Sequence, residues 1–155
     1  MRATLTLFAL VSAATSPAIG QSLEGVWKPV QFVVDSGPDQ GRHTSDVQPG
    51  QLIFTRHHYS MVFVQGFRAR PIPTDSTSVE ELNKLFAPFT AQAGTYERKG
   101  SLLLLSPTVA KHPRVMSLKS PLSITIRNKG DTLWARAKTG PGSGMESTWV
   151  RIERR

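Results

Sequence analysis

Residues 51–65 read QLIFTRHHYSMVFVQ, and the pattern of this stretch decides the class of fold. Its first part, Gln51 to Thr55, and its second part, His58 to Gln65, are rich in residues that favour strands. In the second part the large side chains alternate with others, which is the period of a half-buried strand. The large side chains on one face are Tyr59, Met61 and Phe63. The stretch therefore predicts two paired antiparallel strands with one face turned to an apolar interior.

Strand-like segments of the same kind recur on both sides of this pair, separated by Gly-, Pro-, Asn- and Asp-rich turns. They span residues 25–34, 94–98, 102–105, 115–118, 122–127, 132–138 and 147–154. Residues 35–50 and 106–113 read as loops. Consecutive strands joined by turns predict an all-β, antiparallel chain of eight to nine strands. A closed up-and-down barrel or a two-sheet sandwich would protect the edges of such a sheet.

One segment after residue 77 has a helical pattern. Ser78 followed three residues later by Glu81 forms a capping box, and the apolar residues that follow fall near one face of a helix. Pro88 ends the segment. We therefore expect one short helix, which needs something larger to pack against.

The first twenty residues have the pattern of a secretory signal peptide. Arg2 precedes an apolar stretch at residues 5–14, and Ala18-Ile19-Gly20 places small residues at the positions that a signal peptidase reads. Cleavage before Gln21 leaves a single predicted domain at residues 21–155, which would be secreted or periplasmic. The 155-residue chain has no cysteine, so disulfides and thiolate ligands are excluded.

Short motifs at both ends and in the middle resemble one protein family. They are Gly25-Val26-Trp27, Trp149-Val150-Arg151, the segment Gly50 to Thr55 followed by His58 to Met61, and Ala93-Gly94-Thr95-Tyr96-Glu97. In order and spacing they are similar to the bacterial lipocalin-like domain family, which has a calycin-type β-barrel. The chain departs from the family where relatives carry a His pair after the Ala-Gly-Thr-Tyr hairpin, because residues 102–105 here are four leucines.

The resemblance implies a single eight- to nine-stranded up-and-down barrel with one short helix. In such barrels the tryptophan of the first strand plugs the closed end, and an arginine of the last strand stacks on its ring. Here these residues are Trp27 and Arg151, or Arg154 if the register differs. The resemblance thus assigns Trp27 and Arg151 a structural role in closing the barrel.

A barrel of eight strands has room for one small ligand or for packed side chains. We therefore expect a small apolar or amphipathic molecule in the interior, or else a filled barrel in which the same residues are ordinary core. The candidate cavity residues are Phe32, Phe54, Tyr59, Met61, Phe63, Phe67, Tyr96, Met116 and Trp134.

Neither a metal site nor a catalytic centre is predicted, and no cofactor is implied. His57 and His58 are adjacent, so on a strand they face opposite ways and cannot chelate one ion. The loop that holds His43 also holds Asp35, Asp39 and Asp46, and it is the one place where a general acid and base could meet. We therefore expect a non-catalytic protein. A cyclase- or isomerase-type enzyme on the same barrel remains an alternative.

The net charge of +8 raises the question of acidic partners. The basic residues are scattered rather than interleaved with aromatic ones, so nucleic acid is not an expected partner. Weak attraction to an anionic membrane or glycolipid surface fits an exported basic protein better. A second alternative is an envelope protein that binds a macromolecular partner as an inhibitor or scaffold through the apolar helix face. We expect a monomer or a weak dimer.

Overall fold

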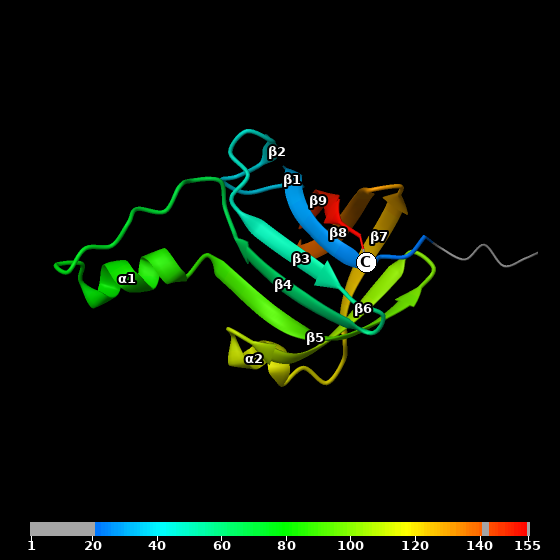
Figure 1. Ribbon diagram of the computed structural model, residues 1–155. Coiled ribbons are helices and arrows are strands. Elements are labelled where there is room, and N and C mark those ends of the chain that lie inside the picture. Colours follow the sequence, from blue (N-terminus) through cyan, green and yellow to red (C-terminus); the bar gives the residue numbers. More distant parts are fainter. Residues whose placement is uncertain (1–20, 141–142, 155) are drawn as a thin grey trace, which may run out of the picture.

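A computed structural model describes residues 21–140 and 143–154 of the chain, and the predicted signal peptide lies outside these residues. Within these residues, nine strands and two helices follow one another (Figure 1). The strands are β1 (Gly25–Val34), β2 (Gly41–His43), β3 (Gly50–Phe54), β4 (His58–Val64), β5 (Phe89–Lys99), β6 (Leu102–Ala110), β7 (Leu122–Lys129), β8 (Thr132–Gly140) and β9 (Ser143–Glu153). The helices are α1 (Val79–Phe86) and α2 (Pro113–Met116).

Eight of the strands form a closed antiparallel barrel. The order is β1-β3-β4-β5-β6-β7-β8-β9, and pairing of β1 with β9 closes the ring. Strand β2 is an extra strand that pairs with the end of β1, where Phe32 lies opposite His43. The prediction of an all-β up-and-down barrel is confirmed, and the sandwich alternative is excluded. Eight-stranded up-and-down barrels of this kind include the lipocalins.

Strand β1 closes the barrel because it pairs with β3 along one edge and with β9 along the other. Its first residues, Gly25 to Trp27, pair with β3, while its last residues pair with β2. It runs against β9 along most of its length, with register shifts between Pro29 and Gln31. Because Pro29 donates no backbone hydrogen bond, an irregularity at this point disturbs the ladder least.

Three local predictions were wrong. The loop predicted at residues 35–50 contains the short strand β2 and also the first residue of β3. Strand β6 continues to Ala110, beyond the predicted end at residue 105, and its Pro107 lies opposite Gly94 at a bulge. Residues 113–116 form the helix α2 instead of a strand at 115–118, because Pro113 occupies the first helical turn, where its fixed φ is favourable.

Helix α1 begins as predicted. The Ser78 side chain accepts a hydrogen bond from the Glu81 backbone, and the Glu81 carboxylate accepts one from the Ser78 backbone. The helix projects away from the barrel and buries none of its residues (Figure 1). Its apolar residues Val79 and Phe86 are 74% and 57% exposed. The predicted apolar face exists, but it does not pack against the barrel.

The core fills one half of the barrel interior. Trp27, Phe54 and Leu133 are its largest fully buried side chains, each at most 2% exposed. Around them lie Leu23, Leu52, Tyr59, Leu103, Leu105, Ile126 and Trp149, with Met61, Tyr96, Leu122, Ile124 and Ala135 packed against the group. At roughly 1.5–3 kcal/mol for each large apolar side chain, this cluster is the main source of stability.

Candidate functional site

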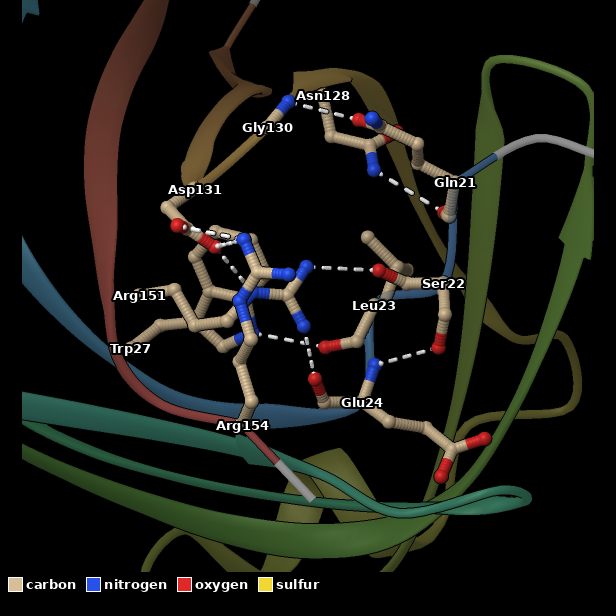
Figure 2. Close-up of polar contacts among 10 residues, drawn as sticks. All are labelled: Gln21, Ser22, Leu23, Glu24, Trp27, Asn128, Gly130, Asp131, Arg151 and Arg154. Atoms are coloured by element: carbon tan, nitrogen blue, oxygen red, sulfur yellow. Dashed lines mark hydrogen bonds and ion pairs between the residues drawn. The ribbon is translucent and has the colours of Figure 1, made fainter.

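One end of the barrel is sealed by the segment that precedes β1. Leu23 of this segment is 3% exposed and belongs to the core. The indole Nε1 of Trp27 donates to the carbonyl oxygen of Leu23 at 2.8 Å. Figure 2 shows residues 21–24 lying beside this tryptophan. The tryptophan thus holds the segment that covers it.

Arg151 completes the seal from β9. Its guanidinium carbon lies 4.2 Å from the centroid of the Trp27 ring, and the two residues are direct partners across β1 and β9. The same guanidinium donates to the carbonyl oxygens of Ser22, at 2.8 Å, and of Glu24 (Figure 2). Its Nε lies 3.1 Å from a carboxylate oxygen of Asp131. One buried cation therefore joins the first strand, the last strand and the covering segment.

The start of the covering segment is bound as well. The carbonyl oxygen of Gln21 accepts from Arg98 at 2.8 Å and from Asn128 at 3.0 Å, and its side-chain oxygen accepts from the Gly130 backbone at 2.8 Å. Arg154 makes two 2.7 Å hydrogen bonds to Asp131 and, together with Arg151, holds the pKa of this carboxyl below its usual range. This end is polar and occupied by the chain itself, so it is a poor place for an apolar ligand.

The opposite end holds a cavity of about 260 Å³. It lies where β1 and β4 end and β9 begins, and the loop after β1 reaches over it. Its lining residues are Phe32, Val34, Asp39, Phe63, Val64, Gln65, Gly66, Phe67 and Met145. We call this cavity the mouth cavity. Its walls are mainly apolar, which is the usual character of a small-molecule site.

The aromatic rings of the mouth cavity are ordered by contacts with one another and with the core. Phe32 meets the buried Trp149 edge-on at 6.5 Å, and Phe63 meets the same ring at 6.5 Å. Phe67 lies edge-on to Phe32 at 5.9 Å. These offset and perpendicular arrangements are the favourable ones for aromatic pairs. The core residue Trp149 therefore holds Phe32 and Phe63 of the cavity wall in place.

His43 of β2 covers the outer side of this wall. Its ring is stacked on Phe67, with 3.4 Å between centroids and 3° between planes. Nδ1 lies 2.8 Å from the Asp46 carboxylate, and Nε2 lies 2.9 Å from the carbonyl oxygen of Asp39. The hydrogen bond to Asp46, followed by that to Asp39, raises the pKa of His43. With both nitrogens facing acceptors, the ring binds its own loop and is not placed as a general base.

Two polar side chains of the mouth cavity present acceptors. The Gln65 side-chain nitrogen donates one of its two hydrogens to the hydroxyl of Thr90 at 3.0 Å, and the Oε1 of the same amide is an acceptor. Asp39 lines the cavity at an exposed position, and its side chain is a carboxylate. Such groups could orient a ligand whose body lies against the phenylalanines.

The structure divides the nine predicted cavity residues into three sets. Phe32, Phe63 and Phe67 meet at the mouth cavity. Phe54, Tyr59, Met61 and Tyr96 point into the barrel but belong to its packed half, where Phe54 lies edge-on to Tyr96 at 5.0 Å.

The remaining two residues, Met116 and Trp134, lie outside the barrel, which corrects the prediction for both. Met116 is on α2 and is 43% exposed. Trp134 follows the buried Leu133 on β8, so it faces outward, and the guanidinium of Arg127 covers its ring at 3.8 Å. Trp134 has the contact expected of a surface aromatic residue paired with a cation.

The two tyrosines of the packed half differ in their hydrogen bonds. The Tyr96 hydroxyl donates to the carbonyl oxygen of Thr55 at 2.9 Å. The Tyr59 hydroxyl is buried and has no partner among the described residues, and burial raises its pKa to about 12. Neither hydroxyl is an acid that ionises near neutral pH.

Several residues of the mouth cavity were not predicted from the sequence. Val34, Val64 and Met145 are ordinary apolar residues near strand ends, and only the closure of β1 on β9 and the ending of β4 bring them together. Asp39 was predicted as a possible acid–base residue of its loop, but not as part of the cavity wall. Gln65 carried no signal beyond its place at the end of an alternating strand.

Other sites are less suited to a ligand. A groove of about 660 Å³ lies outside the barrel between residues 68–73 and α1, but its Ile72 is 90% exposed. Within the part of the chain that the structure describes, no three His, Asp or Glu side chains cluster in a way that could hold a metal ion. None of its helices is long and apolar enough to cross a membrane.

Comparisons with known proteins reveal only distant similarity. No family model matches the chain, and no curated protein matches it. Among solved structures, a lipocalin-like protein from Bacteroides uniformis aligns with 84% of this chain and 98% of its own length. The identity is 13% and the TM-score is 0.48. The assignment of a closed, eight-stranded barrel rests on the strand order and pairing of this chain itself.

Proposed function

We propose that this protein is a secreted or periplasmic, non-catalytic binding protein that holds a small apolar or amphipathic molecule in the mouth cavity of its barrel. The observation that carries this proposal is the position of the cavity. It lies at the end opposite to the seal of Leu23, Trp27 and Arg151, and three phenylalanines line it. A lipocalin-like barrel with one closed and one open end suits a binder.

The free energy of binding would come mainly from burial. Each square ångström of apolar surface removed from water contributes about 25 cal/mol, before the cost of ordering the ligand is subtracted. The phenylalanines are already held by Trp149 and by one another, so little ordering of the wall is required. A wall that is ordered in advance favours binding.

The proposed export rests on residues 1–20. The expected mature chain begins at Gln21. Intact mass measurement of protein expressed with these residues in a bacterial host tests this directly. A mass equal to that of a chain beginning at Gln21, found in the periplasmic fraction, supports export. An uncleaved chain in the cytosol contradicts it.

Binding is tested by native mass spectrometry of the purified mature protein and by titration with an uncharged, fluorescent apolar alcohol. The informative variant is Phe63→Arg, which would fill the mouth cavity with a charged side chain. Its matched control is Val62→Arg, because Val62 is the neighbouring residue on β4 and is 38% exposed. We expect Phe63→Arg to abolish uptake and Val62→Arg to preserve it. Equal uptake by both variants would contradict a site in the mouth cavity.

A second candidate function is binding of a macromolecular partner. It is favoured by the exposed apolar residues Val79 and Phe86 of α1, a helix that buries none of its residues. The two candidates differ in their tests, because Phe86→Asp would impair a partner-binding role while leaving uptake of a small probe unchanged.

A further inference from the structure

The polar side chains that line the mouth cavity present more hydrogen-bond acceptors than donors. Of the described residues that line it, only Asp39 and Gln65 have polar side chains. A carboxylate only accepts hydrogen bonds, and one of the two N–H donors of the Gln65 amide is already used on Thr90. A ligand that carries donors therefore matches more of these groups than a ligand that carries only acceptors.

The aromatic rings of the same wall favour a positive charge. Phe32, Phe63 and Phe67 line the cavity, and the faces of aromatic rings attract cations. The combination of several rings with a carboxylate is suited to an ammonium group, because the rings exclude water while the carboxylate supplies the opposite charge. An anionic headgroup would find no positive charge among the described lining side chains.

The basic residues near the rim do not cancel this preference. The chain carries a net charge of +8, yet none of the described lining residues is Lys, Arg or His. Arg42 donates to the side chain of Gln31, and Arg136 is paired with Asp35. His43 lies behind Phe67, and its nitrogens face Asp46 and the backbone of Asp39. The one charged side chain among the described lining residues of the mouth cavity is thus a carboxylate, in a protein that is basic as a whole.

We propose that the ligand of the mouth cavity is a small apolar amine whose ammonium group binds the Asp39 carboxylate, with Gln65 Oε1 as a second acceptor. The apolar body of the amine lies among the phenylalanines. This inference rests on the proposed function and narrows it, because it assigns a charge to one end of the ligand.

The test compares three probes of nearly equal size by calorimetry at about pH 8, where an aliphatic amine is still protonated. Phenethylamine carries the charge, phenethyl alcohol is neutral, and hydrocinnamate is anionic. We expect phenethylamine to bind at least about tenfold more tightly than phenethyl alcohol, and hydrocinnamate to bind most weakly. The preference for the amine should decrease at high salt, because Asp39 lies at an exposed rim.

Two variants locate the charge preference. Asp39→Asn should lower affinity for phenethylamine to that of phenethyl alcohol, with little effect on the alcohol. Asp75→Asn removes the same charge from an exposed position outside the cavity and should leave all three affinities unchanged. If the alcohol or hydrocinnamate binds as tightly as the amine, the amine proposal fails while the binding function survives. If no probe binds, both proposals fail.

Discussion

The guanidinium of Arg151 lies over the ring of Trp27, 4.2 Å from its centroid, and the two residues are paired across β1 and β9. This contact joins the first and last strands of the barrel at its sealed end. The same guanidinium donates to the carbonyl oxygens of Ser22 and Glu24, so closure of the barrel and covering of its end depend on one side chain. The stacking is a cation–π contact between largely buried groups.

Trp27→Ala should lower the free energy of unfolding by about 3–5 kcal/mol, because it leaves a large cavity and frees the Leu23 carbonyl. Arg151→Met should lower the free energy of unfolding by about 1–3 kcal/mol, because the carbonyl oxygens of Ser22 and Glu24 lose their donor. In a double-mutant cycle measured by urea unfolding, the two should couple by at least about 0.5 kcal/mol. Additive effects would show that the stacking contributes nothing.

The two tyrosines should respond differently to loss of their hydroxyls. Tyr59→Phe removes a buried hydroxyl without a described partner, so stability should be unchanged or higher. Tyr96→Phe removes the hydrogen bond to the Thr55 carbonyl and should cost about 1 kcal/mol. Thermal unfolding of both variants checks the contrast. A clear loss of stability in Tyr59→Phe would mean that its hydroxyl has a partner inside the barrel.

Gly94 is required where β5 bends against β6. A Cβ atom at this position would lie 2.1 Å from the Ser106 carbonyl oxygen and 2.8 Å from Cα of Pro107. Gly94→Ala should therefore cost about 1–3 kcal/mol, because backbone must move. Thr95→Ala, at the next and exposed position, serves as the control and should change stability by less than about 0.5 kcal/mol. Equal melting temperatures of both variants would refute the close approach.

The contact between His43 and Asp46 should depend on pH. Hydrogen bonding to Asp46 raises the pKa of His43 above 6.5, so its contribution is complete below pH 6.5 and is lost as the pH rises through the folded-state pKa. The pKa of Asp46 is lowered from 3.8 by the same bond, so its contribution is lost as the pH falls through that lower value. Both contributions are therefore complete between pH 3.8 and pH 6.5, where His43 is protonated and Asp46 is ionised.

An NMR titration of the His43 ring protons measures this contact. We expect a midpoint above 6.5, and Asp46→Asn should shift it downward. The ring protons of Phe67 should change at the same midpoint, because the two rings are stacked. A His43 midpoint at or below 6.5 in the unmodified protein would contradict the hydrogen bond.

Much of the fold could be predicted because local patterns and tertiary structure agree. The alternation at Tyr59, Met61 and Phe63 predicted an inward face, and the structure pairs Tyr59 with Gly94 and Met61 with Gln92 across β4 and β5. The capping box at Ser78 was also correct. The sequence failed where tertiary pairing overrides local preference. Pro107 would normally end a strand, yet β6 continues through it at a bulge.

The candidate site was less predictable than the fold. A period of two identifies the inward face of a strand, but it does not tell how far along the barrel a residue lies. Phe54 and Phe63 therefore looked alike, although one is in the packed half and the other is in the mouth cavity. Trp134 was misplaced by one residue of register, which is enough to turn a side chain outward.

The central claim is that the mouth cavity is the ligand site, and the methionines test it most directly. The predicted mature domain, residues 21–155, has Met145 at the mouth cavity, Met61 in the packed half and Met116 outside the barrel. We would label the methionine methyl groups with ¹³C and titrate the protein with phenethyl alcohol and phenethylamine. We expect the Met145 resonance to shift with saturation while the Met116 resonance stays unchanged. A saturable shift of Met116 alone, or no shift of Met145 with either probe, would contradict the account.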